Sequence, residues 1–336
     1  MSNRQIIRNF GTCTDGSTVH LVTLENGGTI ASIMTWGASL QDFRRHNTDY
    51  ALILGSPEFS PYLGDMRYFG ATAGPVANRI ANGRAPLNGK FLDLDKNENG
   101  ITTLHGGHPG CSDLNWKLAG YDSHSCRLTL HMEDGLCGFP GNRDFATTYT
   151  LEEDGALVIE MEGRTDALTF CNLAHHSYWN LDNQDTIAAH RLTIYADSYL
   201  PVDHHKIPIG SPKAVSGTSF DFRTPSTIGK KGYSPLDHNF CLQPSEKTLN
   251  PACILEGSNG IKLSVQTTEP GLQVYDGEGL STESVGHEGK SYGAMAGIAL
   301  EPQLWPDAPN QTEYPSILLY PGEVYHQISR FEIFDN

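Results

Sequence analysis

Positive charge is scarce in this chain. Its 336 residues include 23 Lys and Arg against 39 Asp and Glu, which gives a formal net charge of −16 at pH 7. Proteins that bind nucleic acid neutralise phosphates with Lys and Arg, and polybasic segments attract proteins to anionic membranes. The composition therefore argues against nucleic-acid and membrane partners, and it leaves a neutral small molecule or a cation as a compatible ligand.

Long apolar runs and paired cysteines are also missing. No apolar run approaches the roughly 20 residues of a membrane-spanning helix, and the first residues show no apolar signal-peptide core. The seven cysteines are scattered singly without a C-x-x-C pair, so free thiols in a reducing compartment are the simplest account. We expect a cytoplasmic protein, either a monomer or a homodimer.

Motifs for phosphate, dinucleotide and metal binding are absent. The sequence has no G-x-x-x-x-G-K-[ST], no G-x-G-x-x-G after a strand and no H-E-x-x-H. Adjacent histidines such as His175 and His176 point to opposite faces of a strand, which is unsuitable for one metal ion. We accordingly predict no cofactor and no metal.

Short alternating runs, separated by Gly and Pro, are abundant instead. Polar and apolar residues alternate over 127–132, 157–162 and 261–266, and a period of two is typical of a strand with one buried face. Helical signal is confined to short turns over 57–63 and 76–81. The pattern predicts an all-β protein with few short helices.

Turn signals between these runs support the same fold. Asn-Gly and Asp-Gly pairs tolerate positive φ and predict hairpin turns. They occur at 88–89, 99–100, 154–155 and 259–260. No repeat or composition shift divides the chain, so we predict one domain over residues 1–336, with mostly antiparallel strands in two packed sheets.

Three side chains are candidates for catalysis. Glu301 follows a short apolar run and precedes a Pro-rich turn that should hold it rigidly, because prolines fix φ. His105 stands before two glycines, and His176 stands before Ser177 and two aromatic residues. A loop-capping Glu, a surface-loop His and a core His are the plainer interpretations. A carboxylate with two imidazoles nevertheless indicates acid–base chemistry on a neutral polar substrate.

Four further side chains are candidates for substrate binding. Asn78 and Arg79 lie among small residues, Asp237 is a good acceptor for hydroxyl groups, and Gln273 lies in an expected strand. A structural ion pair for Arg79, an Asx turn for Asp237 and an ordinary strand position for Gln273 remain open as alternatives. Aromatic rings beside such polar groups are typical of a sugar site.

Together these motifs resemble the aldose 1-epimerase (galactose mutarotase) family, and the match runs in order over nearly the whole chain. The matching segments are Trp36-Gly37-Ala38, Ala77-Asn78-Arg79-Ile80, Leu104-His105-Gly106-Gly107, Gly138-Phe139-Pro140-Gly141-Asn142, His176-Ser177-Tyr178-Trp179-Asn180-Leu181, Val202-Asp203, Ile207-Pro208-Ile209-Gly210, Asp237-His238-Asn239-Phe240, Pro270-Gly271-Leu272-Gln273-Val274-Tyr275, Leu300-Glu301-Pro302-Gln303 and Pro321-Gly322-Glu323.

The resemblance implies a galactose-mutarotase-like β-supersandwich that interconverts the α and β anomers of a free aldose, such as glucose or galactose, without a cofactor. It implies that Glu301 takes the proton of the C1 hydroxyl and that His176 donates a proton to the ring oxygen. His105 would assist near that oxygen. The residues that match sugar-holding positions are Asn78, Arg79, Asp237 and Gln273.

Three places in the chain depart from the family pattern. Pro75 stands where the family commonly has Arg, Ala174 and His175 stand where Thr and Asn are usual, and Asp276 stands where Thr or Ser is common. All three adjoin expected site residues. Our hypothesis is that His175 and Asp276 alter the preferred sugar rather than the chemistry.

Other functions remain as alternatives. A hexose-6-phosphate 1-epimerase on the same fold would need a basic cluster, for which only Arg79 and the weaker pair Lys230-Lys231 are candidates. A non-catalytic carbohydrate-binding β-sandwich would not need both Glu301 and His176. A glycoside hydrolase usually needs two carboxylates, a role that Glu301 and Asp237 could be taken to fill.

Overall fold

The protein is described by a computed structural model over residues 6–243 and 248–335. This part of the chain forms 27 strands and six short 3-10 turns, and every strand pairing is antiparallel. No helix in these residues is long and apolar enough to cross a membrane. The all-β prediction is therefore confirmed.

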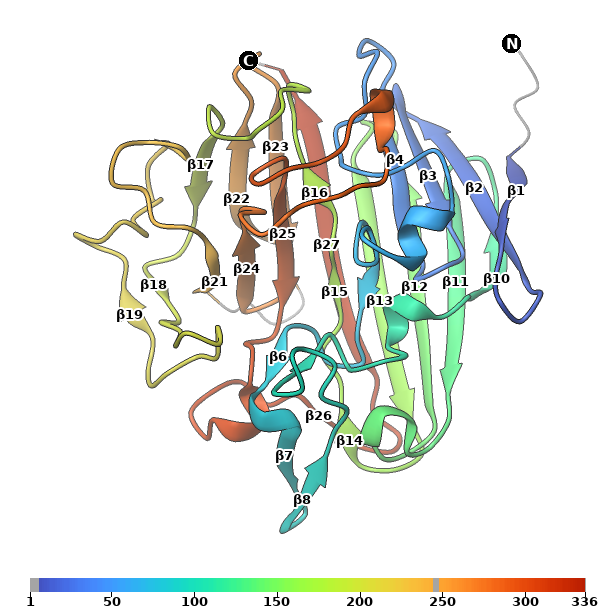
Figure 1. Ribbon diagram of the computed structural model, residues 1–336, viewed down its shortest axis with the longest axis vertical. Helices are drawn as coiled ribbons and strands as arrows, with labels where there is room; N and C mark the ends of the chain where they lie inside the picture. Colours follow the sequence, from blue (N-terminus) through green and yellow to red (C-terminus); the bar gives the residue numbers. More distant parts are fainter. Residues whose placement is uncertain (1–5, 244–247, 336) are drawn as a thin grey trace.

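A nine-stranded sheet runs across the molecule from β17 to β10 (Figure 1). Its strands, in spatial order, are β10 (Lys117–Tyr121), β11 (Ser125–Met132), β12 (Arg143–Leu151), β13 (Leu157–Thr165), β27 (Tyr325–Phe334), β23 (Lys262–Thr267), β22 (Asn250–Glu256), β17 (Arg191–Ile194) and β20 (Ser226–Thr227).

A six-stranded sheet packs against it and carries much of the site described below. Its strands, in spatial order, are β16 (Tyr178–Trp179), β25 (Ile298–Gln303), β24 (Gly271–Tyr275), β21 (Asp237–Cys241), β18 (Ser198–Tyr199) and β19 (Lys213–Ala214).

Smaller elements complete the structure. One four-stranded sheet contains β1 (Ile7–Thr12), β2 (Thr18–Asn26), β3 (Thr29–Met34) and β4 (Ser39–Arg45). Four pairs are β5 (Thr72–Ala73) with β15 (Ala174–His175), β6 (Arg79–Ile80) with β9 (Thr103–Leu104), β7 (Arg84–Leu87) with β8 (Lys90–Asp93), and β14 (Thr169–Phe170) with β26 (Leu318–Leu319). The 3-10 turns are η1 (Ser60–Leu63), η2 (Ala81–Gly83), η3 (Cys111–Asp113), η4 (Leu136–Gly138), η5 (His287–Gly289) and η6 (Ala308–Asn310).

The main core lies between the two large sheets. Trp179 of β16 stacks on Phe331 of β27, with the ring centroids 5.6 Å apart. Leu300 of β25 and Leu272 of β24 belong to the same buried cluster. Because successive side chains of a strand point to opposite faces, this burial directs Glu301 to the other side of the six-stranded sheet. A slip of one residue would reverse the two faces, so the apolar residues fix the register.

The predicted strands are confirmed. Residues 127–132 lie in β11, 157–162 lie in β13, and 261–266 largely coincide with β23. The predicted turns at 88–89, 154–155 and 259–260 join β7 to β8, β12 to β13 and β22 to β23, and the turn at 99–100 closes the bridge from Glu98 to Thr102. The single domain expected over 1–336 stays a prediction, although one core cluster combines strands of both large sheets.

The two predicted helical turns have different outcomes. Within 57–63 the chain forms η1, so that prediction is partly confirmed. The helical turn predicted over 76–81 is wrong. Val76 forms a bridge with Asn172, Arg79 begins the short strand β6, and Asn78 has a φ of 59°, which interrupts a right-handed helix.

Candidate active site

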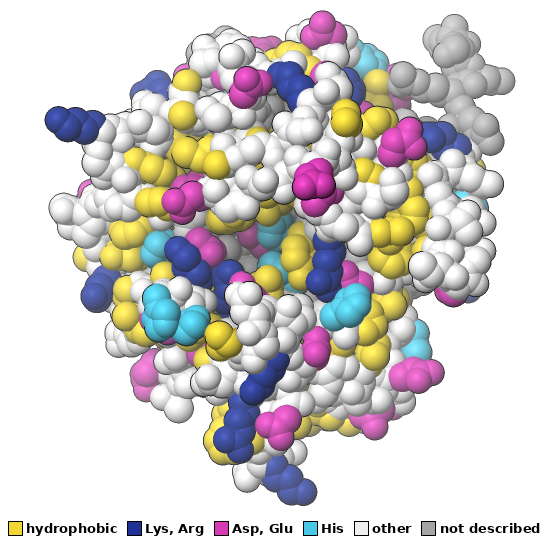
Figure 2. Space-filling model, viewed as in Figure 1, with side chains coloured by type: hydrophobic (Ala, Val, Ile, Leu, Met, Phe, Trp, Pro, Cys, Tyr) yellow, Lys and Arg dark blue, Asp and Glu magenta, His cyan; other side chains and the backbone are white. Residues whose placement is uncertain are grey.

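A cavity of about 350 Å³ lies over the strands that carry Glu301 and Asp237. Figure 2 shows it as a hollow near the centre of one face, with histidine and charged side chains gathered around it. Six of the seven predicted site residues line the cavity. The lining comprises Tyr68, Asn78, Arg79, Leu104, His105, His176, Tyr178, Lys206, Leu236, Asp237, Tyr275, Glu278, Gly279 and Glu301.

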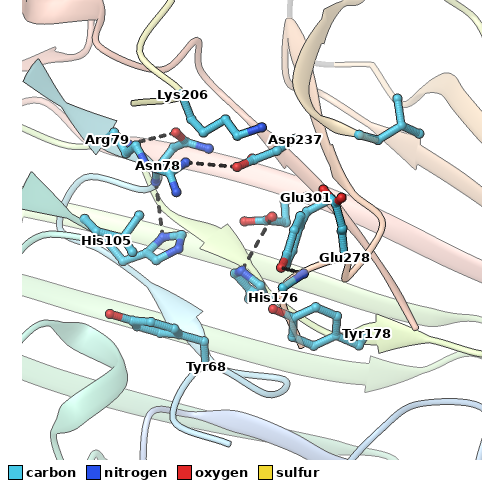
Figure 3. A pocket seen from close by; sticks show the side chains of 14 residues that line it. Tyr68, Asn78, Arg79, His105, His176, Tyr178, Lys206, Asp237, Glu278 and Glu301 are labelled. Carbon is cyan, nitrogen blue, oxygen red and sulfur yellow. Dashed lines mark hydrogen bonds and ion pairs between the residues drawn. The ribbon is translucent and has the colours of Figure 1, made fainter. Parts of the chain in front are cut away.

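Glu301 and His176 form a buried pair in this cavity (Figure 3). His176 Nε2 lies 3.6 Å from Glu301 Oε1, and the two residues are only 4% and 2% exposed. Glu301 is fixed by β25. The backbone of His176 is held on both sides, because its N–H donates to Ala71 O at 2.9 Å and its carbonyl accepts from Gly70 N–H at 3.0 Å. The pair is therefore placed by rigid backbone.

Burial shifts the two pKa values in opposite directions. Loss of water raises the pKa of Glu301 well above its usual value, with a further rise from Asp237 and an opposing effect from Arg79. The same burial lowers the pKa of His176 to about 4. Burial therefore favours the uncharged form of each group, a protonated carboxyl and a neutral imidazole. An acid–base exchange requires one proton shared between two such groups.

His105 and Asn78 hold each other in left-handed backbone conformations, with φ values of 50° and 59°. The Asn78 N–H donates to His105 Nδ1 at 3.2 Å, and the His105 N–H donates to Asn78 O at 2.9 Å. Because Nδ1 accepts, the ring proton of the neutral imidazole is assigned to Nε2. Burial, with smaller effects of His176, Arg79 and Arg67, lowers the pKa of His105 well below its usual value. His105 is thus a neutral hydrogen-bond donor.

Aromatic rings enclose the two histidines. The Tyr68 ring centroid lies 4.8 Å from that of His105 and 6.0 Å from that of His176, and the second contact is stacked. Tyr178 lies 5.0 Å from His176 on the other side. These contacts restrict rotation of both imidazoles. They also give the cavity the apolar surface on which the C–H face of a sugar can pack.

Arg79 is clamped between two carboxylates. Its Nε and Nη2 donate to Glu98 at 2.8 Å, and its Nη1 donates to Asp237 Oδ2 at 3.3 Å. Both interpretations of Arg79 therefore hold in part. Arg79 forms a structural ion pair with Glu98, and it also lines the cavity. Sequence reasoning missed Glu98. The Asn99-Gly100 turn beside it was visible, but its approach to Arg79 depends on pairing of β6 with β9.

Gln273 lies beside Glu301 and Asp237 but is not among the residues that line the cavity. Its Nε2 donates to Asp237 Oδ1 at 2.7 Å, and it stands opposite Glu301 in the pairing of β24 with β25. The structure therefore places Gln273 as a support for Asp237. Direct contact between Gln273 and a sugar stays a prediction.

The three departures from the family pattern lie outside the cavity lining. Pro75 packs under Gly106, whose added Cβ would come within 2.3 Å of its ring. His175 faces the core, with Nε2 2.7 Å from Ser177 Oγ. Asp276 is buried and joins two lining segments, because it accepts from Leu236 N–H at 2.8 Å and Glu278 N–H at 3.0 Å.

Two other lining residues were not expected from the sequence. Lys206 lies in the segment between Val202 and Pro208, and Glu278 follows β24. Both stand within or beside segments that matched the family, so their positions in the sequence could have indicated that they belong to the site. Within the described residues no three His, Cys, Asp or Glu side chains group together as ligands for a metal ion.

The sandwich, the buried carboxyl–imidazole pair and the surrounding rings together are suited to acid–base chemistry on a hydroxyl-rich substrate. Comparison with known proteins agrees with this class. The family model described as Aldose 1-epimerase matches residues 20–332. The chain is 38% identical to rat galactose mutarotase, with 94% of each chain covered. It is 35% identical to the aldose 1-epimerase of Escherichia coli K12, with 95% of this chain and 96% of that protein covered.

Solved structures show the same similarity. A homologue of aldose epimerase from C. elegans has a TM-score of 0.88 at 28% identity, covering 94% of this chain and 98% of that one. Galactose 1-epimerase from Lactobacillus acidophilus NCFM has a TM-score of 0.85 at 28% identity, covering 98% of each chain. The chain belongs to the aldose 1-epimerase family, and it is an isomerase with the galactose-mutarotase fold.

Proposed function

We propose that this protein interconverts the α and β anomers of a free hexose, such as glucose or galactose, through the Glu301–His176 pair. The observation that carries the proposal is the 3.6 Å separation of His176 Nε2 and Glu301 Oε1 within a polar cavity. Opening of a cyclic hemiacetal requires removal of a proton from one oxygen and delivery of a proton to its neighbour. Two groups at this separation can serve both oxygens of one anomeric centre.

In the forward direction Glu301, as carboxylate, removes the proton of the C1 hydroxyl. The C1–O5 bond breaks as His176, as imidazolium, donates its proton to the ring oxygen, and an open-chain aldehyde results. Rotation about C1–C2 presents the other face of the carbonyl group. Ring closure then reverses both transfers, so that no net proton is consumed. This step uses the charged forms of both groups, whereas burial favours the uncharged forms, so the bound sugar has to stabilise the proton on His176.

The other polar groups have binding roles in this proposal. His105 donates from Nε2 near the ring oxygen, because its Nδ1 is occupied by the Asn78 N–H. Arg79 and Asp237 bind sugar hydroxyls with the hydrogen-bonding capacity that their mutual ion pair leaves free. Asn78 contributes its side-chain amide, and Gln273 acts through Asp237.

A phosphorylated hexose is poorly supported as the substrate. Recognition of a phosphate dianion usually employs several Arg or Lys donors. The cavity lining contains two such cations, Arg79 and Lys206, and Arg79 already pairs with Glu98 and Asp237. Lys230 and Lys231 do not line the cavity.

The test is the optical rotation of freshly dissolved α-D-glucose and α-D-galactose. We expect the protein to accelerate the approach to the equilibrium rotation without changing that value. Glu301→Gln should lower the rate at least about 10²-fold, as expected for loss of a general base. Glu269→Gln is a matched control, because Glu269 is also buried but lies outside the cavity. Sugar binding without acceleration would instead indicate a binding protein.

A further inference from the structure

Lys206 is a cation in the cavity lining to which the structure assigns no partner. It is half-buried, and its side chain extends across the cavity toward Asp237 (Figure 3). Its ammonium group makes no hydrogen bond or ion pair with residues 6–243 and 248–335. A partly desolvated ammonium group without a carboxylate partner gains free energy when an anionic or strongly accepting ligand binds.

The backbone holds Lys206 in an unusual conformation. Its φ is 62°, in the left-handed region that costs a non-glycine residue roughly 1–2 kcal/mol. Asp203 stabilises the turn, because its carbonyl accepts from Lys206 N–H at 3.0 Å and its Oδ1 accepts from Ile207 N–H at 3.0 Å. Strained non-glycine residues that the surroundings hold in place cluster at ligand sites. The turn thus fixes the direction in which this lysine enters the cavity.

The neighbouring charges do not use the ammonium group. Asp237 accepts from Gln273 at Oδ1 and from Arg79 at Oδ2, and neither bond involves Lys206. Arg79 is in turn occupied by Glu98. Lys206 is therefore the uncommitted cation of the described lining, and it stands away from the buried Glu301.

We propose that Lys206 is a specificity-determining residue that binds a carboxylate on the sugar, so that the substrates include free hexuronic acids. This inference rests on the proposed anomer interconversion and names a substrate class for the same site. An exocyclic carboxylate leaves the hemiacetal and the ring hydroxyls intact. One ammonium group matches the single negative charge of a carboxylate, whereas a phosphate dianion would need further cations that this lining lacks.

Glu278 opposes Lys206 at the same cavity. It is exposed, it lies in the lining, and its backbone N–H is held by Asp276 at 3.0 Å. A negative charge here repels an anionic sugar and leaves a neutral sugar unaffected by comparison. Removal of the two charges should therefore change the preference for uronic acids in opposite directions, which an unspecific structural effect would not do.

The experiment compares anomer exchange of galacturonate with galactose, and of glucuronate with glucose, by following the anomeric protons in NMR. The readout is the ratio of kcat/KM for acid and neutral sugar. We expect Lys206→Met to lower this ratio about tenfold, the loss expected for one charge-assisted hydrogen bond. Lys206→Arg should retain most of the ratio, and Glu278→Gln should raise it. Lys213→Met, an exposed lysine outside the cavity, is the matched control and should leave it unchanged.

The outcomes separate this inference from the proposed function. Acceleration of neutral sugars with an unchanged ratio in Lys206→Met would overturn the assignment of Lys206 alone. No acceleration of uronates by the unmodified protein would also overturn it. Glucose 6-phosphate is tested as a further substrate. If Lys206→Met lowers kcat/KM for glucose 6-phosphate but not for the uronates, the carboxylate is rejected in favour of a phosphate. No acceleration of any free sugar would remove the proposed function itself. A ratio that falls in Lys206→Met, rises in Glu278→Gln and converges at high salt would support the inference.

Discussion

Gln273 and Asp237 are joined by a hydrogen bond of 2.7 Å from Nε2 to Oδ1, across the neighbouring strands β24 and β21. The bond fixes one oxygen of a carboxylate whose other oxygen accepts from Arg79 at 3.3 Å. Asp237 therefore has little freedom to rotate. In the proposed complex a sugar hydroxyl would meet a carboxylate that is already oriented, which would reduce the entropy lost on binding.

This relationship predicts the effect of Gln273→Leu. We expect KM for galactose to rise about tenfold with a smaller change in kcat, because Asp237 loses its orientation while the Glu301–His176 pair is untouched. The measurement is steady-state polarimetry of Gln273→Leu, Asp237→Asn and the double variant. The two effects should be strongly non-additive, since the residues act through one bond. Gln266→Leu, at another strand position outside the cavity, is the control. Additive effects would contradict a supporting role.

The pH dependence follows from the opposite pKa shifts of the pair. Burial lowers the pKa of His176 to about 4 and raises that of Glu301 well above 4.5. The pair holds two protons below the lower value, one between the two values and none above the higher value, and only the one-proton form is active. We expect kcat/KM, which reports the protein without sugar, to fall on the acid side near pH 4 and on the basic side as the last proton leaves. An acid limb near 6.5, the ordinary value for histidine, would contradict this assignment.

His175 should affect stability rather than sugar preference. Its ring faces the core, where it lies 5.8 Å from the Phe331 ring and contacts Ser177 Oγ, and it is absent from the cavity lining. We expect His175→Asn to lower the free energy of unfolding by about 1–3 kcal/mol through lost packing and an unpaired hydroxyl. The ranking of glucose, galactose and pentoses should stay unchanged. A changed ranking would restore our earlier hypothesis for this residue.

Asp276, unlike His175, is connected to the cavity, because its carboxylate accepts hydrogen bonds from the backbone of two lining residues. Asp276→Ser should loosen both segments that its carboxylate holds, those of Leu236 and Glu278, and it should raise KM several-fold for all sugars. Steady-state rates with glucose and galactose measure the effect. A change for one sugar only would indicate a direct role in specificity.

From the burial of the Glu269 carboxyl group we predict a loss of stability at alkaline pH. It is 7% exposed, and burial raises its pKa to about 8 from an ordinary 4.5. The folded protein keeps a proton that the unfolded chain releases. Its contribution to stability is therefore fully present below 4.5, and it is lost as pH rises toward 8.

The variant Glu269→Gln should remove this dependence. We expect it to be more stable than the unmodified protein by about 2–4 kcal/mol at about pH 9, and to differ little at about pH 5, since one pKa unit corresponds to about 1.4 kcal/mol. Urea unfolding at several pH values is the measurement. Glu58→Gln, at an exposed position, is the control. Parallel stability curves for Glu269→Gln and the unmodified protein would contradict the raised pKa.

Much of this structure follows from local patterns in the sequence. Period-two alternation identified β11, β13 and β23, and the Asn-Gly and Asp-Gly pairs identified turns, because both signals depend on a few adjacent residues. The positive φ of Asn78 and the bridge of Val76 were not predictable, since each depends on partners distant in sequence.

The candidate site shows the same division. Local motifs correctly identified several of the side chains that line the cavity. These include Glu301, His176, His105, Arg79 and Asp237. The contact of Gln273 with Asp237 could not be inferred, because it depends on the pairing of strands that are distant in sequence. The orientation of His175 toward the core could have been predicted, because adjacent residues of a strand point to opposite faces.

The acid–base pair and the mouth of the cavity are built from different kinds of backbone. Glu301 belongs to a sheet strand whose register is fixed by a buried core, whereas Lys206 and Glu278 belong to surface turns. Such turns tolerate exchange far better than core strands do. Loop grafting at 204–206 and 277–280, with Asp203 and Asp276 retained as supports, is thus a route to new substrate ranges that leaves the Glu301–His176 pair in place.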